Sequence, residues 1–198
     1  MENICVFGAS SSALDEAYYR AGYQLGAELA KAGFGLVFGG GNLGIMGATA
    51  RGAHSAGGQV IGVVPNFMAE VEGLVYPKAD ELIITDTMRE RKMKMEELSV
   101  GFITTPGGIG TFEEFFEILT LRQLKQHKKA LVVLNTEAYY DPMITMLEHC
   151  VNQMFSSKTV LDLFTVAGTP KEAVEQLQNY EYAEFADKWH IGSDLRKA

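Results

Sequence analysis

The segment PGGIGTFEE, residues 106–114, carries the most informative pattern in the chain. An apolar, strand-like segment precedes it at 101–105, and residues 115–125 after it have the spacing of a helix. A strand, a glycine turn and a helix start together form a cradle for an anion, because the first N–H groups of a helix have no partner within it. We expect Thr111 to cap this helix or to donate its hydroxyl to a phosphate. A plain strand-to-helix turn is the alternative.

The composition is that of an ordinary globular domain. The chain has 198 residues, of which 47% are hydrophobic and 21% charged, so it is long enough to bury a core. We expect one domain over residues 1–180 and a polar C-terminal tail over 181–198. The net charge of −8 argues against nucleic-acid partners and against membrane-surface binding, because both require a basic face.

The sequence also predicts where the protein works. Cys5 and Cys150 are its only cysteines, which is too few for a disulfide framework. Its first strand follows the N-terminus without a leader pattern, and no apolar run approaches the roughly 18 residues of a membrane span. These features predict a cytoplasmic protein.

Strand-like and helix-like segments alternate along nearly the whole chain. This alternation predicts an α/β fold with a doubly wound, mainly parallel sheet and helices on both faces. In such sheets ligands bind beyond the carboxyl ends of the strands, where the strand order reverses. Turns of small residues are expected there at 8–12, 39–44 and 106–111, and residues 66–80 are expected to form a loop or short helix that can move over a site.

The second glycine turn has the G-x-G-x-x-G spacing at Gly39, Gly41 and Gly44, which by itself indicates dinucleotide binding. The next strand ends at Val64-Pro65-Asn66, without the carboxylate that would hold a ribose. We therefore expect no dinucleotide, and interpret the glycines as close backbone approach to a nucleotide or as tight helix–sheet packing. The histidines lack metal-ligand spacing, so no metal is expected.

Two charged side chains fall on apolar helix faces. Arg91 shares a predicted face with Met95, so it must find an anion or a cleft. Glu114 shares a face with Ile118, whereas Glu113 groups with polar residues. A carboxylate among apolar neighbours and beside an anion cradle is the better placed for chemistry. The alternatives are an arginine paired with a structural carboxylate or reaching the surface, and carboxylates favoured by the helix dipole.

The combination of these motifs resembles the LONELY GUY family, cytokinin riboside 5′-monophosphate phosphoribohydrolases that are often labelled lysine decarboxylases. The resemblance rests on Arg91-Lys92, on the cradle motif with Glu114 and on residues 39–47, and it covers about residues 2–155. It implies that Arg91 and Glu114 are the catalytic pair, without a cofactor. The substrate-binding residues that it implies are Glu72, Lys92, Gly107, Gly108, Gly110, Thr111, Glu113 and Thr120.

The reaction that follows is hydrolysis of the N-glycosidic bond of a purine nucleoside 5′-monophosphate, giving free base and ribose 5-phosphate. Glu114 would stabilise positive charge on the ribose and activate water, while Arg91 would position the substrate. A nucleotide- or phosphate-binding protein without turnover is the alternative. Lysine decarboxylation is disfavoured, because nothing in the sequence indicates a lysine that holds pyridoxal phosphate.

Two further expectations concern the base and the assembly. The base stays open between isoprenylated adenine, adenine and another purine. The family resemblance implies a homodimer, and Phe115, Phe116 and Leu119 are expected to form an exposed stripe that a partner subunit completes.

Overall fold

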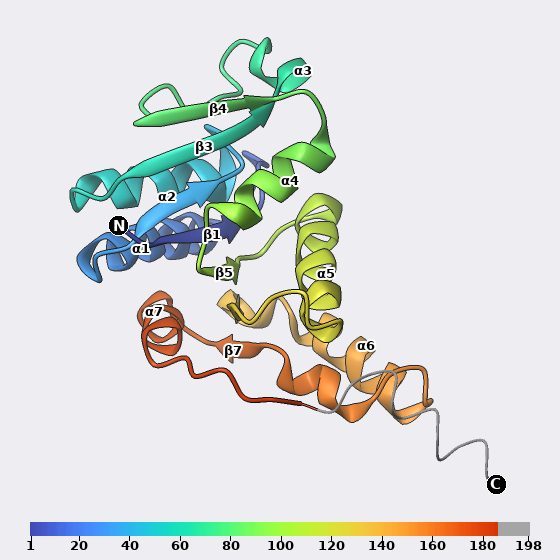
Figure 1. Cartoon of the computed structure of the whole chain (residues 1–198). Helices are drawn as coiled ribbons and strands as arrows, with labels where there is room; N and C mark the ends of the chain where they lie inside the picture. Colours follow the sequence, from blue (N-terminus) through green and yellow to red (C-terminus); the bar gives the residue numbers. More distant parts are fainter. Residues whose placement is uncertain (186–198) are drawn as a thin grey trace, which may run out of the picture.

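In the computed structural model, residues 1–185 are described and form a seven-stranded sheet in which every strand pair is parallel (Figure 1). The strand order is β4-β3-β2-β1-β5-β6-β7, so the order reverses between β1 and β5. The prediction of a doubly wound parallel sheet is confirmed. The strands are β1 Asn3–Phe7, β2 Gly35–Phe38, β3 Val60–Pro65, β4 Glu81–Thr85, β5 Gly101–Thr104, β6 Ala130–Leu134 and β7 Thr165–Ala167.

Helices cover both faces of the sheet. The layer on one face holds α1 Glu16–Lys31, α2 Gly44–Ser55 and α7 Pro170–Gln178 (Figure 1). The layer on the other face holds α4 Met88–Glu97, α5 Ile109–Gln123 and α6 Asp141–Asn152. The remaining short elements are α3 Asn66–Ala69, η1 Thr136–Ala138 and η2 Lys158–Asp162.

Side-chain alternation along each strand supplies two separate core layers. In β1, Ile4 and Val6 pack in the layer with α1, α2 and α7, whereas Cys5 and Phe7 pack in the layer with α4, α5 and α6. All four side chains are buried. Burial on both faces is why the strands read as continuous apolar runs rather than as alternating patterns.

The point of strand reversal brings two loops together. The turn after β1 and the cradle after β5 are joined by Ala9 N, which donates to Pro106 O at 3.1 Å. Thr105 Oγ1 donates to Phe7 O at 2.9 Å. A side chain at Gly8 would meet Thr105 Oγ1 at 2.2 Å, so the turn requires glycine there. The carboxyl ends of β1 and β5 therefore carry one fixed double loop.

The cradle helix begins earlier than expected. It starts at Ile109, and Gly108 is its N-cap. Thr111 lies inside the first turn, so the expectation that it caps the helix is wrong. Glu113 and Glu114 lie in the second turn rather than at the helix start. Glycine is a poor helix former but an acceptable N-cap, and the apolar packing of α5 extends the helix through Gly110.

The exposed stripe expected on α5 is also wrong. Phe115 is 0% exposed and Leu119 4% exposed, because α6 and the segment around Phe164 cover that side of the helix. The rings of Phe115 and Phe164 meet edge to face at 5.6 Å. Phe116 is half-buried beside them. The homodimer therefore stays a prediction, and the expected stripe on α5 no longer supports it.

Residues 181–185 follow α7 without a helix or strand, and residues 186–198 of the expected tail lie outside the described residues. In the part that is described, Cys5 and Cys150 are both free thiols. None of the helices within residues 1–185 has the length and apolar character needed to cross a bilayer.

Candidate active site

A cleft of about 350 Å³ opens where the strand order reverses, at the carboxyl ends of β1 and β5. Such a volume falls within the range of roughly 300–1,000 Å³ typical of small-molecule sites. The turn after β1, the cradle, α4 and α5 all contribute walls. The residues that line it are Gly8, Ala9, Ser10, Ser11, Met46, Met68, Met88, Arg91, Gly108, Ile109, Gly110, Thr111 and Glu114.

The cradle presents a row of backbone amides without partners. Among residues 1–185, nothing accepts the N–H groups of residues 107–111, whereas Phe112 N donates to Gly108 O at 3.0 Å. These amides stand at the positive end of the dipole of α5, which has 15 residues. An anion such as a phosphate is the ligand that this end of the helix favours.

Glycine occupies the three positions of the cradle for different structural reasons. A side chain at Gly107 would meet Thr111 Oγ1 at 2.1 Å, so this glycine is required by the packing of the loop itself. A side chain at Gly108 or Gly110 would meet no described atom within 4 Å. These two positions instead leave open the space in front of the amides.

Arg91 and Glu114 form a buried ion pair at the wall of the cleft. Arg91 comes from α4 and is 5% exposed, and Glu114 comes from α5 and is 8% exposed. Arg91 Nη1 donates to Glu114 Oε1 at 2.8 Å, and Arg91 Nε donates to Val63 O at 3.1 Å. Two bonds to different groups fix the plane of the guanidinium. The structure thus brings together Arg91 and Glu114, the two side chains expected to form the catalytic pair.

Burial also changes the pKa of the Glu114 carboxyl group. Desolvation raises the pKa of Glu114 above its ordinary value of 4.5, and the charge and hydrogen bond of Arg91 lower it in part. The desolvation effect is the larger of the two. A carboxylate with a raised pKa is a better proton acceptor than an exposed one, which suits a general base.

The glycines of the turn at 39–44 allow close packing around the Arg91–Glu114 pair. A side chain at Gly39 would lie 2.0 Å from Arg91 Nη2, so β2 can end beside the guanidinium only with glycine there. Gly44 has a φ of +63° and lies against Ala9 O, which an added side chain would meet at 2.3 Å. Tight packing, one of the two roles expected from the sequence, is confirmed for these glycines.

A narrower recess of about 40 Å³ adjoins the main cleft. It shares Ser10, Met46, Met68 and Arg91 with that cleft, and is otherwise lined by Gly39, Gly40, Gly41, Leu43, Val64, Leu74 and Val75. The loop after α3 closes it, because Asn42 N donates to Leu74 O and Tyr76 N donates to Gly40 O, both at 2.8 Å. The loop at 66–80 thus borders the site as expected.

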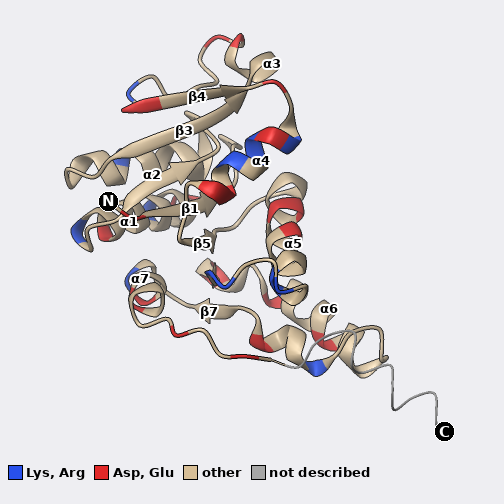
Figure 2. Ribbon diagram, viewed as in Figure 1, with Lys and Arg blue, Asp and Glu red and all other residues tan. Residues whose placement is uncertain are grey.

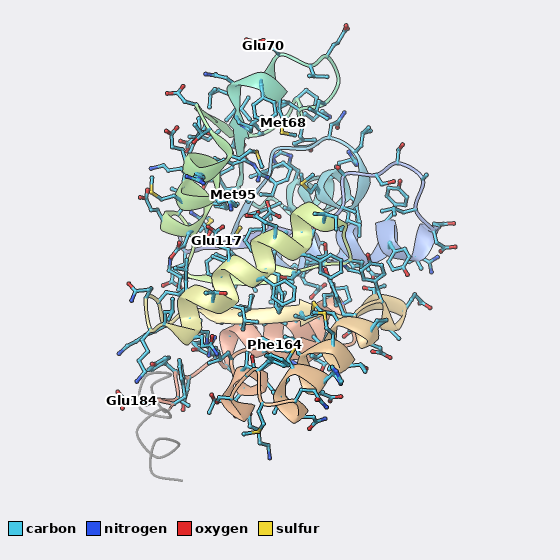
Figure 3. The ribbon with its side chains drawn as sticks, turned by 90° about the vertical axis from the view of Figure 1, so that its right-hand side faces the viewer. Met68, Glu70, Met95, Glu117, Phe164 and Glu184 are labelled. Carbon is cyan, nitrogen blue, oxygen red and sulfur yellow. The ribbon has the colours of Figure 1, made fainter. Side chains whose placement is uncertain are left out.

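Several predicted substrate-binding residues do not line the cleft. Lys92 contacts Glu113, and its Nζ lies 2.8 Å from Glu117 Oε2, on the outer sides of α4 and α5. Figure 3 shows Glu117 on the side of α5 toward α4, and Met68 at the short helix α3. Basic and acidic segments alternate along α4 in Figure 2. Lys92 follows Arg91 by one residue, and one residue turns a helix by about 100°, so the two side chains point differently.

Thr120 and Glu72 also lie apart from the cleft. Thr120 is exposed on α5, on the face that carries Glu113 and Glu117. Glu72 is exposed in the turn after α3. Gly107 packs against Thr111 and does not line the cleft either, whereas Gly108, Gly110 and Thr111 do line it. Substrate binding by Glu72, Lys92, Gly107, Glu113 and Thr120 therefore stays a prediction.

Part of the wall was not predicted residue by residue. Ser10 and Ser11 lie in the turn at 8–12, which the sequence placed at the point of strand reversal without giving either serine a role. Met46, Met68 and Met88 come from three separate elements, and only the tertiary fold brings them together. Methionine patterns on helices ordinarily indicate core packing, so these positions carried no usable signal.

The fold and the cleft define a Rossmann-like α/β protein whose cleft is bordered by the free amides of a helix N-terminus. A family model described as "Possible lysine decarboxylase" matches residues 46–177. A rice protein (Oryza sativa subsp. japonica) named "Probable cytokinin riboside 5'-monophosphate phosphoribohydrolase LOGL5" is 37% identical over 177 residues, which cover 89% of this chain and 72% of the relative. An Arabidopsis thaliana protein named "Cytokinin riboside 5'-monophosphate phosphoribohydrolase LOG7" is 36% identical over 180 residues, with 91% and 82% covered. The chain belongs to the family of these proteins, the LONELY GUY family.

Solved structures share the architecture. A molybdenum cofactor binding protein from Rippkaea orientalis superposes with a TM-score of 0.69 at 22% identity, covering 90% of this chain and 96% of that one. The molybdenum cofactor carrier protein of Chlamydomonas reinhardtii gives a TM-score of 0.66 at 24% identity, covering 91% and 100%. At such identity the likeness establishes the fold alone.

Proposed function

We propose that the protein hydrolyses the N-glycosidic bond of a purine nucleoside 5′-monophosphate, of the cytokinin or the adenosine type, to free base and ribose 5-phosphate. The observation that carries this proposal is the buried Arg91–Glu114 pair beside a row of unpartnered amides. The names of the relatives describe the same reaction class.

The 5′-phosphate is assigned to the amides of residues 108–111. The space before Gly108 and Gly110 is open, and the helix dipole favours a negative charge there. A phosphate held at this end of the cleft anchors the substrate far from the reacting bond. Its binding energy then orients the ribose for the chemical step.

Glu114 is assigned to the ribose. Its Oε1 accepts from Arg91, and no residue in the described part of the chain binds Oε2. As the base leaves, the ribose gains oxocarbenium character, and a nearby carboxylate stabilises that charge. The pKa of Glu114, raised by burial, makes the carboxylate basic enough to take a proton from the attacking water.

Arg91 is assigned to the leaving base. In the main cleft, the apolar side chains of Met46, Met68 and Met88 line the wall together with Arg91. An aromatic base placed there has its ring against apolar side chains and its developing negative charge near a cation. The guanidinium cannot shift freely, because Val63 O and Glu114 both hold it.

The test is a panel of nucleoside 5′-monophosphates that includes AMP and N6-isopentenyl-AMP, with chromatography for free base and an assay for ribose 5-phosphate. The expected result is equal amounts of the two products from at least one nucleotide, and much slower release from the matching nucleoside, which lacks the phosphate. Binding of nucleotides without release of any base would support the non-catalytic alternative instead.

A further inference from the structure

Three successive carbonyl groups of the cradle each accept a hydrogen bond from outside it. Tyr140 Oη donates to Thr105 O at 2.7 Å, and Tyr139 Oη donates to Gly107 O at 2.6 Å. Between them, Ala9 N donates to Pro106 O at 3.1 Å. The loop that leads into α5 therefore has its carbonyl oxygens fixed one after another.

Fixing a carbonyl also fixes the next amide. The peptide group is planar and trans, so the Gly107 carbonyl and the Gly108 N–H point in opposite directions. The hydroxyl of Tyr139 holds this carbonyl on one side, and the amide of Gly108 faces the other way. Gly108 lines the cleft, and within residues 1–185 its N–H has no acceptor.

The backbone before the two tyrosines is strained. Glu137 has a φ of 53° and Ala138 a φ of 56°, which places two consecutive non-glycine residues in the left-handed region. The side chain of Asn135 supports this turn: its Oδ1 accepts from Tyr140 N at 2.7 Å, and its Nδ2 donates to Asp141 Oδ1 at 2.7 Å. Strain of this kind persists where surrounding contacts over-determine the backbone, and it concentrates at functional sites.

The strained turn positions the side chains of the two tyrosines. It places the hydroxyls of two adjacent tyrosines on carbonyls of the same loop, two residues apart. The tyrosine rings stand nearly perpendicular, at 83°, with their centroids 5.1 Å apart. Tyr140 is fully buried, whereas Tyr139 is 38% exposed, so Tyr139 reaches the cradle from its solvent side.

We propose that Tyr139 is a positioning residue for substrate phosphate, which acts by holding the Gly107–Gly108 peptide with its amide toward the cleft. The inference rests on the proposed function, because it takes the cradle as the site of the 5′-phosphate. Tyr139 does not line the cleft itself. Its effect passes through one hydrogen bond to the backbone.

The test compares Tyr139→Phe with Tyr180→Phe. Tyr180 Oη also donates to a backbone carbonyl, Lys128 O at 3.0 Å, but far from the cleft, so this variant loses an equivalent bond at an unrelated place. Calorimetric titrations use ribose 5-phosphate, which carries the phosphate and is not hydrolysed, and adenine, which lacks a phosphate. Thermal unfolding of each variant reports any general loss of stability.

For Tyr139→Phe we expect about fivefold weaker binding of ribose 5-phosphate, as the loss of one hydrogen bond implies, with unchanged binding of adenine. The KM for the nucleotide rises by a similar factor while kcat changes little. For Tyr180→Phe we expect both ligands to bind as they do to the unmodified protein.

Other results overturn the inference. They are unchanged ribose 5-phosphate binding in Tyr139→Phe, equal weakening for ribose 5-phosphate and adenine, an equal effect in Tyr180→Phe, and no ribose 5-phosphate binding by the unmodified protein. Failure of the proposed function is a separate result: the unmodified protein binds ribose 5-phosphate but releases no base. In that case the titrations still decide the role of Tyr139.

Discussion

Replacement of Glu114 by glutamine removes the charge that the proposed chemistry needs and little else. Glutamine has the same shape, and its Oε1 can still accept from Arg91, which lies 2.8 Å away in the native pair. A general base or charge stabiliser contributes about 10²–10⁴-fold to a rate. At 1.36 kcal/mol for each factor of ten, this corresponds to about 3–5 kcal/mol of barrier.

The same change acts on stability in two opposing ways, because burial disfavours the charge of Glu114, which glutamine lacks, while Arg91 loses its anionic partner. Arg91 is 5% exposed, so in Glu114→Gln it becomes a buried cation without a charged partner. The hydrogen bonds that Arg91 donates to the introduced amide and to Val63 O limit this loss. Turnover must therefore be measured below the unfolding transition of the variant, which thermal unfolding establishes.

The assay is free-base release from the best nucleotide of the panel, with Glu117→Gln as the matched control. Glu117 lies on the same helix with an exposed carboxylate and contacts Lys92 on the outer surface. We expect Glu114→Gln to lose at least a hundredfold in kcat and to keep nucleotide binding, and Glu117→Gln to stay within about twofold, because exposed ion pairs contribute little. Turnover of Glu114→Gln within threefold of the unmodified protein would refute the role of Glu114.

Four further predictions concern the same cleft. In Gly39→Ala the new methyl lies 2.0 Å from Arg91 Nη2, so we expect a displaced guanidinium and about a 10²-fold lower kcat in a folded protein; unchanged turnover would contradict this. In Gly108→Ala the methyl meets no described atom within 4 Å, so thermal stability should hold while ribose 5-phosphate binds about tenfold more weakly, and equal affinity would count against the phosphate site. Burial raises the pKa of Glu114 above 4.5, so the acid limb of kcat/KM should lie above pH 4.5, and a limb at or below that pH would be inconsistent. For stability, the folded state holds this proton more tightly than the unfolded state, so the free energy of unfolding should fall as the pH rises from 4.5 through the folded pKa, and Glu114→Gln should lack that slope.

The sequence predicted the architecture because its signals were local and repeated. Strands buried on both faces give continuous apolar runs, and these alternated with helical patterns along the chain. Arg91 and Glu114 were predictable for a related reason. Each is a charge on an apolar helix face, and such a charge must find a partner or a cleft; the structure supplies both.

Other features depended on contacts that no local pattern records. The apolar side of α5 around Phe115 looked like a stripe for a partner subunit, but α6 and Phe164 cover it within the same chain. The helix start at Ile109 was obscured by the glycines around it, whose low helix propensity is overridden by packing. The contact of Tyr139 with Gly107 joins residues 32 positions apart and required the fold itself.

The proposed mechanism requires the amides of the cradle to hold the 5′-phosphate, with residue 114 at the ribose and Arg91 at the base. A crystal structure of Glu114→Gln with bound AMP tests it most directly. We expect phosphate oxygens within about 2.7–3.2 Å of the amide nitrogens of residues 108–111, with the glutamine side chain at the ribose and Arg91 at the base. A phosphate bound at Lys92 on the outer surface, with the cradle unused, would contradict it.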